Sequence, residues 1–117
     1  MSVKKSQDVE VQDIAAAKNT TIQVLIPSGE GPNFAMRKIS MKPGGSMPLH
    51  TNTVEHEQYV LGGQARVGIG EQVYEVREGN VMFIPEGVPH FYETIGDKPF
   101  EFLCMIPNKE DVITVVD

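Results

Sequence analysis

The chain contains three histidines, and their positions suit a single metal site. They are His50, His56 and His90. His50 and His56 lie six residues apart, and His90 directly follows the proline- and glycine-rich stretch 85–89. Imidazole is the commonest protein ligand for metal ions. Because the chain uses histidine nowhere else, we expect the three imidazoles to hold one divalent transition metal ion.

Three imidazoles leave part of a metal ion's coordination sphere open. Water, a substrate or O2 can occupy the remaining positions, and open positions are typical of a catalytic rather than a structural metal site. Three imidazoles suit Zn, Cu, Fe or Ni, and geometry and metal availability decide the occupant more than affinity does. The ligands alone therefore do not identify the ion.

Short runs rich in Val, Ile, Tyr and Phe must position these histidines. Eleven glycines and eight prolines separate the runs, which is typical of a sandwich, a barrel or a jelly roll. We expect strands at residues 21–26, 34–41, 58–61, 65–69, 72–77, 81–84, 90–94 and 100–106, with a turn at Pro43-Gly44-Gly45. A single domain is expected, with an irregular or briefly helical arm (1–20), an all-β barrel (21–108) and a tail or edge strand (109–117).

The alternation of side chains along a strand adds candidates for the site. If His56 points into the barrel, so does Gln58, and His90 likewise shares a face with Tyr92. We expect Gln58 and Tyr92 to contact substrate or support the metal ligands. Met47 is a candidate for the mouth of the site.

Composition excludes several classes of partner and compartment. The net charge of −6 argues against nucleic acid and acidic membranes, which require a basic surface. The single cysteine, Cys104, excludes an intrachain disulfide and a cysteine-based zinc cluster. Residues 1–10 contain no apolar run typical of a signal peptide, and no segment is apolar enough to span a membrane. A cytoplasmic protein is expected.

Two motifs around the histidines resemble those of the cupin superfamily. The first cupin motif is written G-x5-H-x-H-x3,4-E-x6-G, and Gly44, His50, His56 and Gly63 match its conserved positions, with His56 in place of the Glu. The second is written G-x5-P-x-G-x2-H-x3-N. It is matched in register by Gly79, Pro85, Gly87 and His90. The likeness spans most of residues 20–108 and is greatest to small manganese-binding cupins of thermophiles.

Two positions depart from the cupin motifs. Asn52 stands where the family has its second histidine, and Thr94 stands where the second motif has asparagine. A four-histidine site is therefore not available. Either His50, His56 and His90 bind the metal with water, or the amide oxygen of Asn52 is a weak fourth ligand.

The resemblance implies a double-stranded β-helix, a jelly-roll barrel that forms a homodimer, and it favours Mn or Fe as the metal. It also implies a mononuclear metal-dependent oxidoreductase, with a dioxygenase-like reaction on a small organic substrate. Two alternatives are a non-oxidative metal-dependent isomerase or lyase, and a non-catalytic module that binds a small molecule. Because one fold hosts many functions, the residues leave these three open.

Overall fold

The computed structural model describes residues 1–117. It is almost entirely β-structure, with one short 3-10 helix, η1 (Ser6–Asp8). The strands are β1 (Gln12–Asp13), β2 (Lys18–Ile26), β3 (Phe34–Asn52), β4 (His56–Gly62), β5 (Gln64–Ile69), β6 (Gln72–Arg77), β7 (Val81–Ile84), β8 (His90–Ile95), β9 (Phe100–Pro107) and β10 (Ile113–Val115). No helix is long and apolar enough to cross a bilayer.

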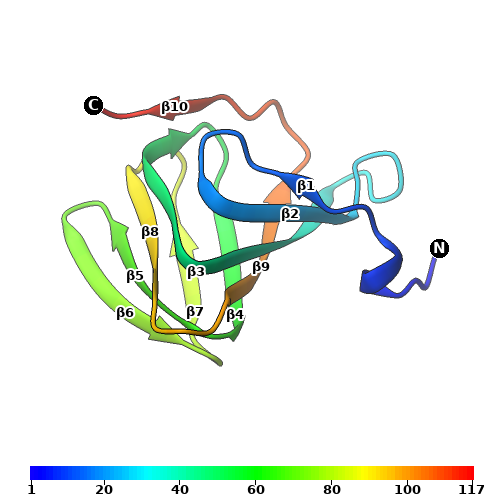
Figure 1. Cartoon of the computed structure of the whole chain (residues 1–117). Helices are drawn as coiled ribbons and strands as arrows, with labels where there is room; N and C mark the ends of the chain where they lie inside the picture. The colour runs from blue at the N-terminus through cyan, green and yellow to red at the C-terminus, as the bar shows by residue number, and fades with distance from the viewer.

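The strands form one strongly curled antiparallel sheet in the order β6-β5-β8-β3-β9-β4-β7, with β2 and β10 also paired to β3. Figure 1 shows the sheet wrapping around itself, so that β5, β6 and β8 face β4, β7 and β9. This arrangement is a jelly-roll barrel and confirms the predicted all-β fold.

Strand β3 joins the two halves of the barrel, and this corrects one prediction. A turn was expected at Pro43-Gly44-Gly45, but the strand continues through these residues to Asn52. Gly44 has a positive φ of 79°, so the chain bends there without ending the strand. Before the bend β3 pairs with β9, and beyond it β3 pairs with β8.

Alternation of buried and exposed residues builds the core. Along β4, His56, Gln58 and Val60 are buried while the residues between them are exposed, as the sequence predicted. The side chains of both halves meet in a cluster that includes Tyr92 and Phe102, whose rings stack with centroids 5.2 Å apart. Ile39, Met47 and Tyr92 belong to this core and also line the cavity that contains the histidines.

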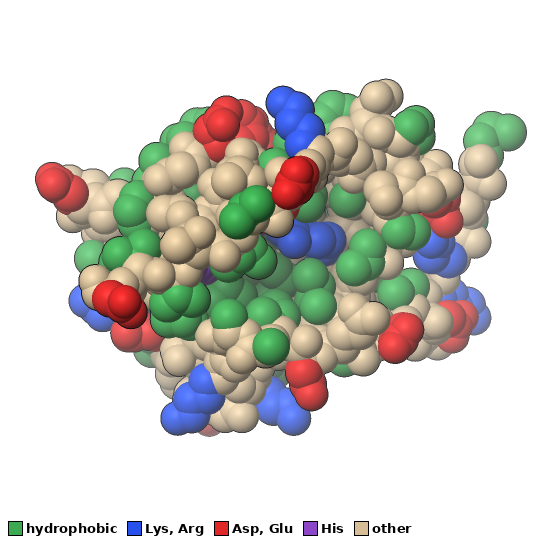
Figure 2. Space-filling model, turned by 90° about the horizontal axis from the view of Figure 1, so that it is seen from above, with side chains coloured by type: hydrophobic (Ala, Val, Ile, Leu, Met, Phe, Trp, Pro, Cys, Tyr) green, Lys and Arg blue, Asp and Glu red, His purple; other side chains and the backbone are tan.

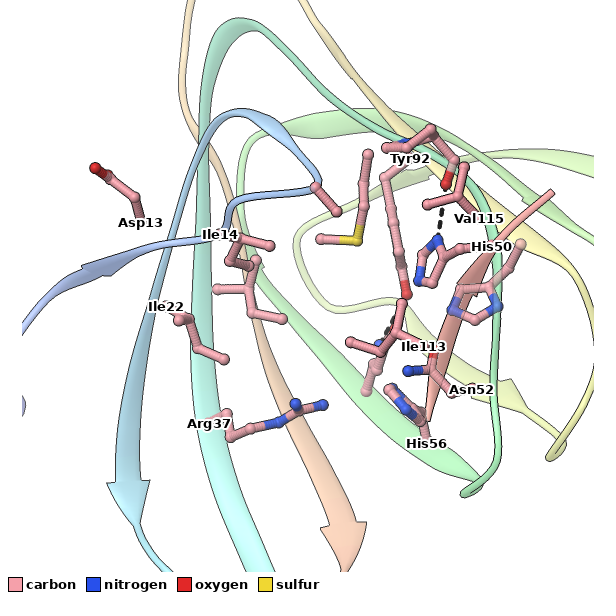
Figure 3. A pocket seen from close by; sticks show the side chains of 16 residues that line it. Asp13, Ile14, Ile22, Arg37, His50, Asn52, His56, Tyr92, Ile113 and Val115 are labelled. Atoms are coloured by element: carbon pink, nitrogen blue, oxygen red, sulfur yellow. Dashed lines mark hydrogen bonds between the residues drawn. The ribbon is translucent and has the colours of Figure 1, made fainter. Parts of the chain in front are cut away.

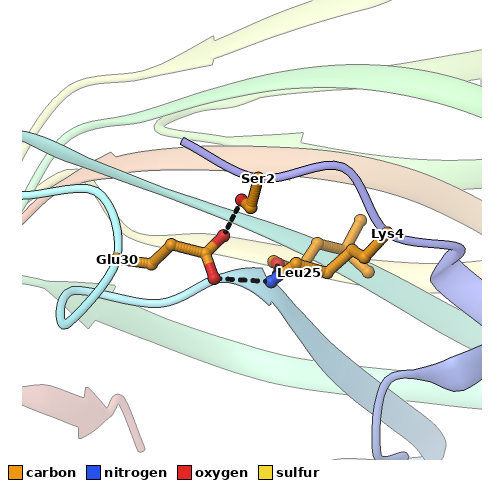
Figure 4. A network of polar contacts seen from close by, with 4 residues as sticks. All are labelled: Ser2, Lys4, Leu25 and Glu30. Atoms are coloured by element: carbon orange, nitrogen blue, oxygen red, sulfur yellow. Dashed lines mark hydrogen bonds and ion pairs between the residues drawn. The ribbon is translucent and has the colours of Figure 1, made fainter.

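The N-terminal and C-terminal segments contact the rest of the protein through hydrogen bonds and an ion pair. Near the N-terminus, Lys4 forms a 2.9 Å ion pair with Glu30, and Ser2 donates a hydrogen bond to the same carboxylate (Figure 4). The hydrogen bond from Lys4 lowers the pKa of Glu30 most, and the hydrogen bond from Ser2 lowers it further. Near the C-terminus, β10 pairs antiparallel with the last residues of β3.

Candidate functional site

A cavity of about 280 Å³ lies at one end of the barrel. The structure brings all seven predicted side chains to its wall: Met47, His50, Asn52, His56, Gln58, His90 and Tyr92. They come from β3, β4 and β8, and Figure 3 shows four of them, His50, Asn52, His56 and Tyr92, around the cavity. The rest of the wall is mainly apolar and comes from the β1–β2 region, β3 and β10: Ile14, Ala16, Ile22, Ile39, Pro48, Ile113 and Val115.

The ends of three strands position the histidines. His50 lies near the end of β3, while His56 and His90 are the first residues of β4 and β8. His50 and His90 are register partners across the β3–β8 pair. Their ring centroids lie 4.1 Å apart, and those of His56 and His90 lie 5.9 Å apart. The three rings therefore form one group, although they are separated by up to 40 residues in sequence.

Backbone carbonyls fix the tautomer of two of these rings. Nδ1 of His50 lies 2.7 Å from the carbonyl oxygen of Pro48, and Nδ1 of His90 lies 2.9 Å from that of Val88. A carbonyl oxygen can only accept, so Nδ1 donates in each pair. In the neutral ring Nε2 then carries the free lone pair that a metal requires.

Burial keeps two of the histidines neutral. Desolvation lowers the pKa of His56 to about 3, helped by the positive charge of Arg37. Desolvation also lowers the pKa of His90 to about 4, although its hydrogen bond to Val88 acts in the opposite direction. At neutral pH both rings are therefore uncharged, as metal ligands must be.

The donor set of this site fits a transition metal ion. Nε2 of His56 and Nε2 of His90 are buried and have no hydrogen-bond partner in the protein. Unpaired buried acceptors are rare in folded proteins and require an explanation such as an ion. The side chains are not arranged as a closed centre, however, because no three His, Cys, Asp or Glu groups are positioned to hold an ion together. Metal binding would therefore need these side chains to move closer together.

Asn52 is oriented by a residue that follows the barrel. Its Nδ2 lies 3.2 and 3.1 Å from the two carboxylate oxygens of Asp111. A carboxylate accepts hydrogen bonds, so the amide nitrogen must face Asp111. The amide oxygen Oδ1 then faces the other way, and it is buried without a partner. Its orientation is compatible with the predicted role as a fourth ligand.

Gln58 and Tyr92 form a closed polar pair in the cavity wall. The amide nitrogen of Gln58 lies 2.9 Å from the Tyr92 hydroxyl, which in turn lies 3.0 Å from the Gln58 amide oxygen. Nε2 of Gln58 also lies 3.4 Å from Sγ of Cys104. Burial raises the pKa of Tyr92, so the phenol stays neutral and holds its proton.

Sequence reasoning missed two polar residues at the site. Arg37 lines the cavity from β3, and Asp111 reaches Asn52 from outside the motifs. Alternation along β3 could have found Arg37, since the buried residues Ala35, Ile39 and Met41 share its face. Nothing in the sequence pattern identifies Asp111.

Comparison with known proteins identifies the family. The cupin domain model matches residues 37–106, more than half of the chain. The chain therefore belongs to the cupin family. Relatives include mannose-1-phosphate guanylyltransferase RfbM of Salmonella typhimurium, 39% identical over 62% of this chain, and oxalate decarboxylase OxdC of Bacillus subtilis, 31% identical over 60%. This chain spans only 15% and 20% of those two proteins.

Solved structures cover the chain more fully. The polyketide cyclase RemF from Streptomyces resistomycificus superposes with a TM-score of 0.92 over 100% of this chain and 86% of that one, at 30% identity. A cupin-2 domain protein of Rhodospirillum rubrum, Rru_A2000, gives a TM-score of 0.85 at 25% identity, over 99% of this chain and 80% of that one. These likenesses support the jelly-roll fold over the whole chain.

Proposed function

We propose that this cupin is a metal-dependent enzyme that closes a ring in a small poly-β-carbonyl substrate. The observation that carries the proposal is an apolar cavity in which two buried imidazole nitrogens have no protein partner. The kinship with the polyketide cyclase RemF over the full length of this chain supports the reaction class. The proposed reaction is therefore non-oxidative, in contrast to the dioxygenase-like reaction that the resemblance to cupins implied.

His50, His56 and His90 would hold the metal, with Oδ1 of Asn52 as a candidate fourth ligand. When bound, a divalent ion polarises carbonyl oxygens and thereby acidifies the carbon between them. Mn and Fe stay the expected ions, with Cu, Zn and Ni as alternatives. The backbone carbonyls of Pro48 and Val88 would keep the His50 and His90 rings oriented.

Ring closure needs a folded substrate and little water, and a mainly apolar cavity wall would favour both. In such a closure a carbon between two carbonyls loses a proton and attacks another carbonyl carbon, which gives a C–C bond and a hydroxyl group. Loss of that hydroxyl with a neighbouring hydrogen as water completes the unsaturated ring. Apolar side chains such as Ile39 and Met47 would pack against the carbon skeleton. The paired Gln58 and Tyr92 would shape the wall without exchanging protons.

The test combines metal content with turnover. Untagged protein should contain about one transition metal ion per chain, and His56→Ala should lose it. Loaded protein should convert a short poly-β-carbonyl thioester to a ring product that has lost one water, without O2 and faster than buffer or His56→Ala does. Mass spectrometry of metal and product provides both readouts.

The same experiment separates the alternatives. A product that gains oxygen atoms, formed only in air, would favour the dioxygenase-like oxidoreductase. Ligand-dependent stabilisation without conversion of any substrate would favour a small-molecule-binding cupin. Protein that neither contains nor takes up metal would contradict the metalloenzyme itself.

A further inference from the structure

The cavity contains one permanently charged group that the reaction described above does not use. Arg37 is the only Lys or Arg side chain in its wall. The guanidinium is partly buried and points into the cavity toward His56 and Asn52 (Figure 3). Seen from above, the molecule is hollowed, with hydrophobic side chains around the hollow and a basic group within it (Figure 2).

No carboxylate neutralises Arg37. The three ion pairs of the protein are Lys4–Glu30, Lys38–Glu101 and Arg66–Glu93. The one hydrogen bond from the Arg37 side chain goes to Sγ of Cys104 at 3.1 Å, a weak acceptor. Its Nε is buried without any partner. The adjacent Lys38, on the opposite face of β3, has the carboxylate that Arg37 lacks.

The acids nearest the cavity are not placed to compensate this charge. Asp13 is the only carboxylate in the wall, and Figure 3 shows it directed away from Arg37. Asp111 is hydrogen bonded to Asn52 and Thr53. A guanidinium does not lose its proton in proteins, and burying it unpaired is costly. The free protein therefore presents an uncompensated cation to whatever enters the cavity.

We propose that Arg37 binds a carboxylate group of the ligand, and that the substrate is therefore a small carboxylic acid with an apolar or ring-forming body. Arginine is the side chain best suited to pair with a carboxylate through two parallel hydrogen bonds. Ile22 and Ile39, which line the same cavity, supply surface for the body of the ligand.

Cavity size limits that body. About 280 Å³ lies just below the usual range for small-molecule sites, which suits one or two rings. With its carboxylate on Arg37, such a ligand would extend toward the histidines. The claim that this ligand is a substrate rests on the proposed function, whereas the charge recognition depends on the cavity alone.

Binding of benzoate and of its uncharged analogue benzamide tests the proposal. We expect metal-free wild-type protein to bind benzoate more tightly than benzamide in calorimetric titrations. Arg37→Gln should weaken benzoate binding about tenfold or more, since a hydrogen-bonded charge pair is lost, and leave benzamide binding unchanged. Arg37→Lys should retain part of the preference. Arg66→Gln, which removes an exposed arginine, should behave as wild type.

Several results would overturn the assignment. Equal affinity for benzoate and benzamide in the wild type would do so without any variant, and so would absence of binding by either. In metal-loaded protein, benzoate binding that survives Arg37→Gln but disappears on chelation would place the carboxylate on the metal instead. Charge-selective binding without ring closure would leave the anion site standing and contradict the cyclase function alone.

Discussion

His50 and His90 share one local arrangement. In each, Nδ1 donates to the carbonyl of the residue two positions earlier, Pro48 for His50 and Val88 for His90. His56 differs, because its Nδ1 lies 3.3 Å from Sγ of Cys104. Backbone carbonyls therefore orient the rings of His50 and His90, whereas the buried side chain of Cys104 contacts the ring of His56.

Burial of neutral histidines makes the metal-free protein sensitive to acid. In the unfolded chain a histidine takes up a proton near pH 6.5, but His56 and His90 do so only near pH 3 and pH 4 in the folded state. The unfolded state therefore binds more protons between these limits, and stability falls as the pH falls. Each group contributes a slope of about 1.4 kcal/mol per pH unit.

Denaturant unfolding of chelated protein at pH 7, 6, 5 and 4 would measure this loss. Replacing a buried histidine with an uncharged residue removes its contribution to the slope of stability against pH. The unfolding free energy of His56→Gln should therefore depend less steeply on pH than that of the wild type. A wild-type curve that is flat from pH 6 to pH 4 would contradict the burial of these rings in the neutral state.

The histidines could be predicted from sequence because the motif spacing and strand alternation both place them. The same alternation correctly placed Gln58 beside His56 and Tyr92 beside His90 on buried faces. Alternation along β3 places Arg37 on the same face as buried residues, but its contact with Cys104 spans 67 residues, and the contact between Asn52 and Asp111 spans 59. Such distances are set by the closed barrel and not by any local pattern.

Strands β3 and β10 supply much of the wall of the proposed metal site. β3 carries Arg37, Met47, His50 and Asn52, and β10 pairs with its last three residues. The strands themselves were mostly predictable from hydrophobic runs and turn residues. The continuation of β3 through Pro43 was not, because proline and glycine normally interrupt a strand and only the barrel's curvature requires a bend here.

The segment before β10 should influence the metal through Asn52. Because Asp111 fixes the Asn52 amide, we expect Asp111→Ala to weaken metal binding about 10-fold to 100-fold, as other losses of supporting hydrogen bonds to ligands do. Competition with a chromogenic chelator measures the affinity. Asp111→Asn should have a smaller effect, because its amide oxygen can still accept one bond.

Asp97→Asn, in the loop between β8 and β9, is the matched control and should leave metal affinity unchanged. If Asp111→Ala binds metal as tightly as the wild type, Asn52 is not a ligand. The three histidines would then hold the ion with water alone.

At the scale of the whole molecule, the outer face of β4 and β7 exposes a group of apolar side chains. On the outer face of β4 and β7, Tyr59 and Val81 are register partners. Val81 is 73% exposed and Phe83 55%. β7 is also the last strand of the sheet path, so its outer edge lacks a neighbour. Contiguous exposed apolar residues mark protein–protein contacts.

We therefore propose that this face forms the expected homodimer. Light scattering after gel filtration should give about twice the 12.9 kDa mass of the chain. Val81→Lys should shift the protein toward the monomer, because it would place a charge in the interface. Val73→Lys, at an exposed position on β6, should not. A wild-type protein that runs as a monomer at high concentration would contradict the dimer.

The strand that completes the cavity, β10, is held by few contacts. β10 has three register partners, all on β3, and its residues are exposed even though Ile113 and Val115 reach the cavity. Segments with few buried contacts open at a small fraction of the global unfolding free energy. Local detachment of β10 would therefore widen access to the cavity while the closed barrel stays intact.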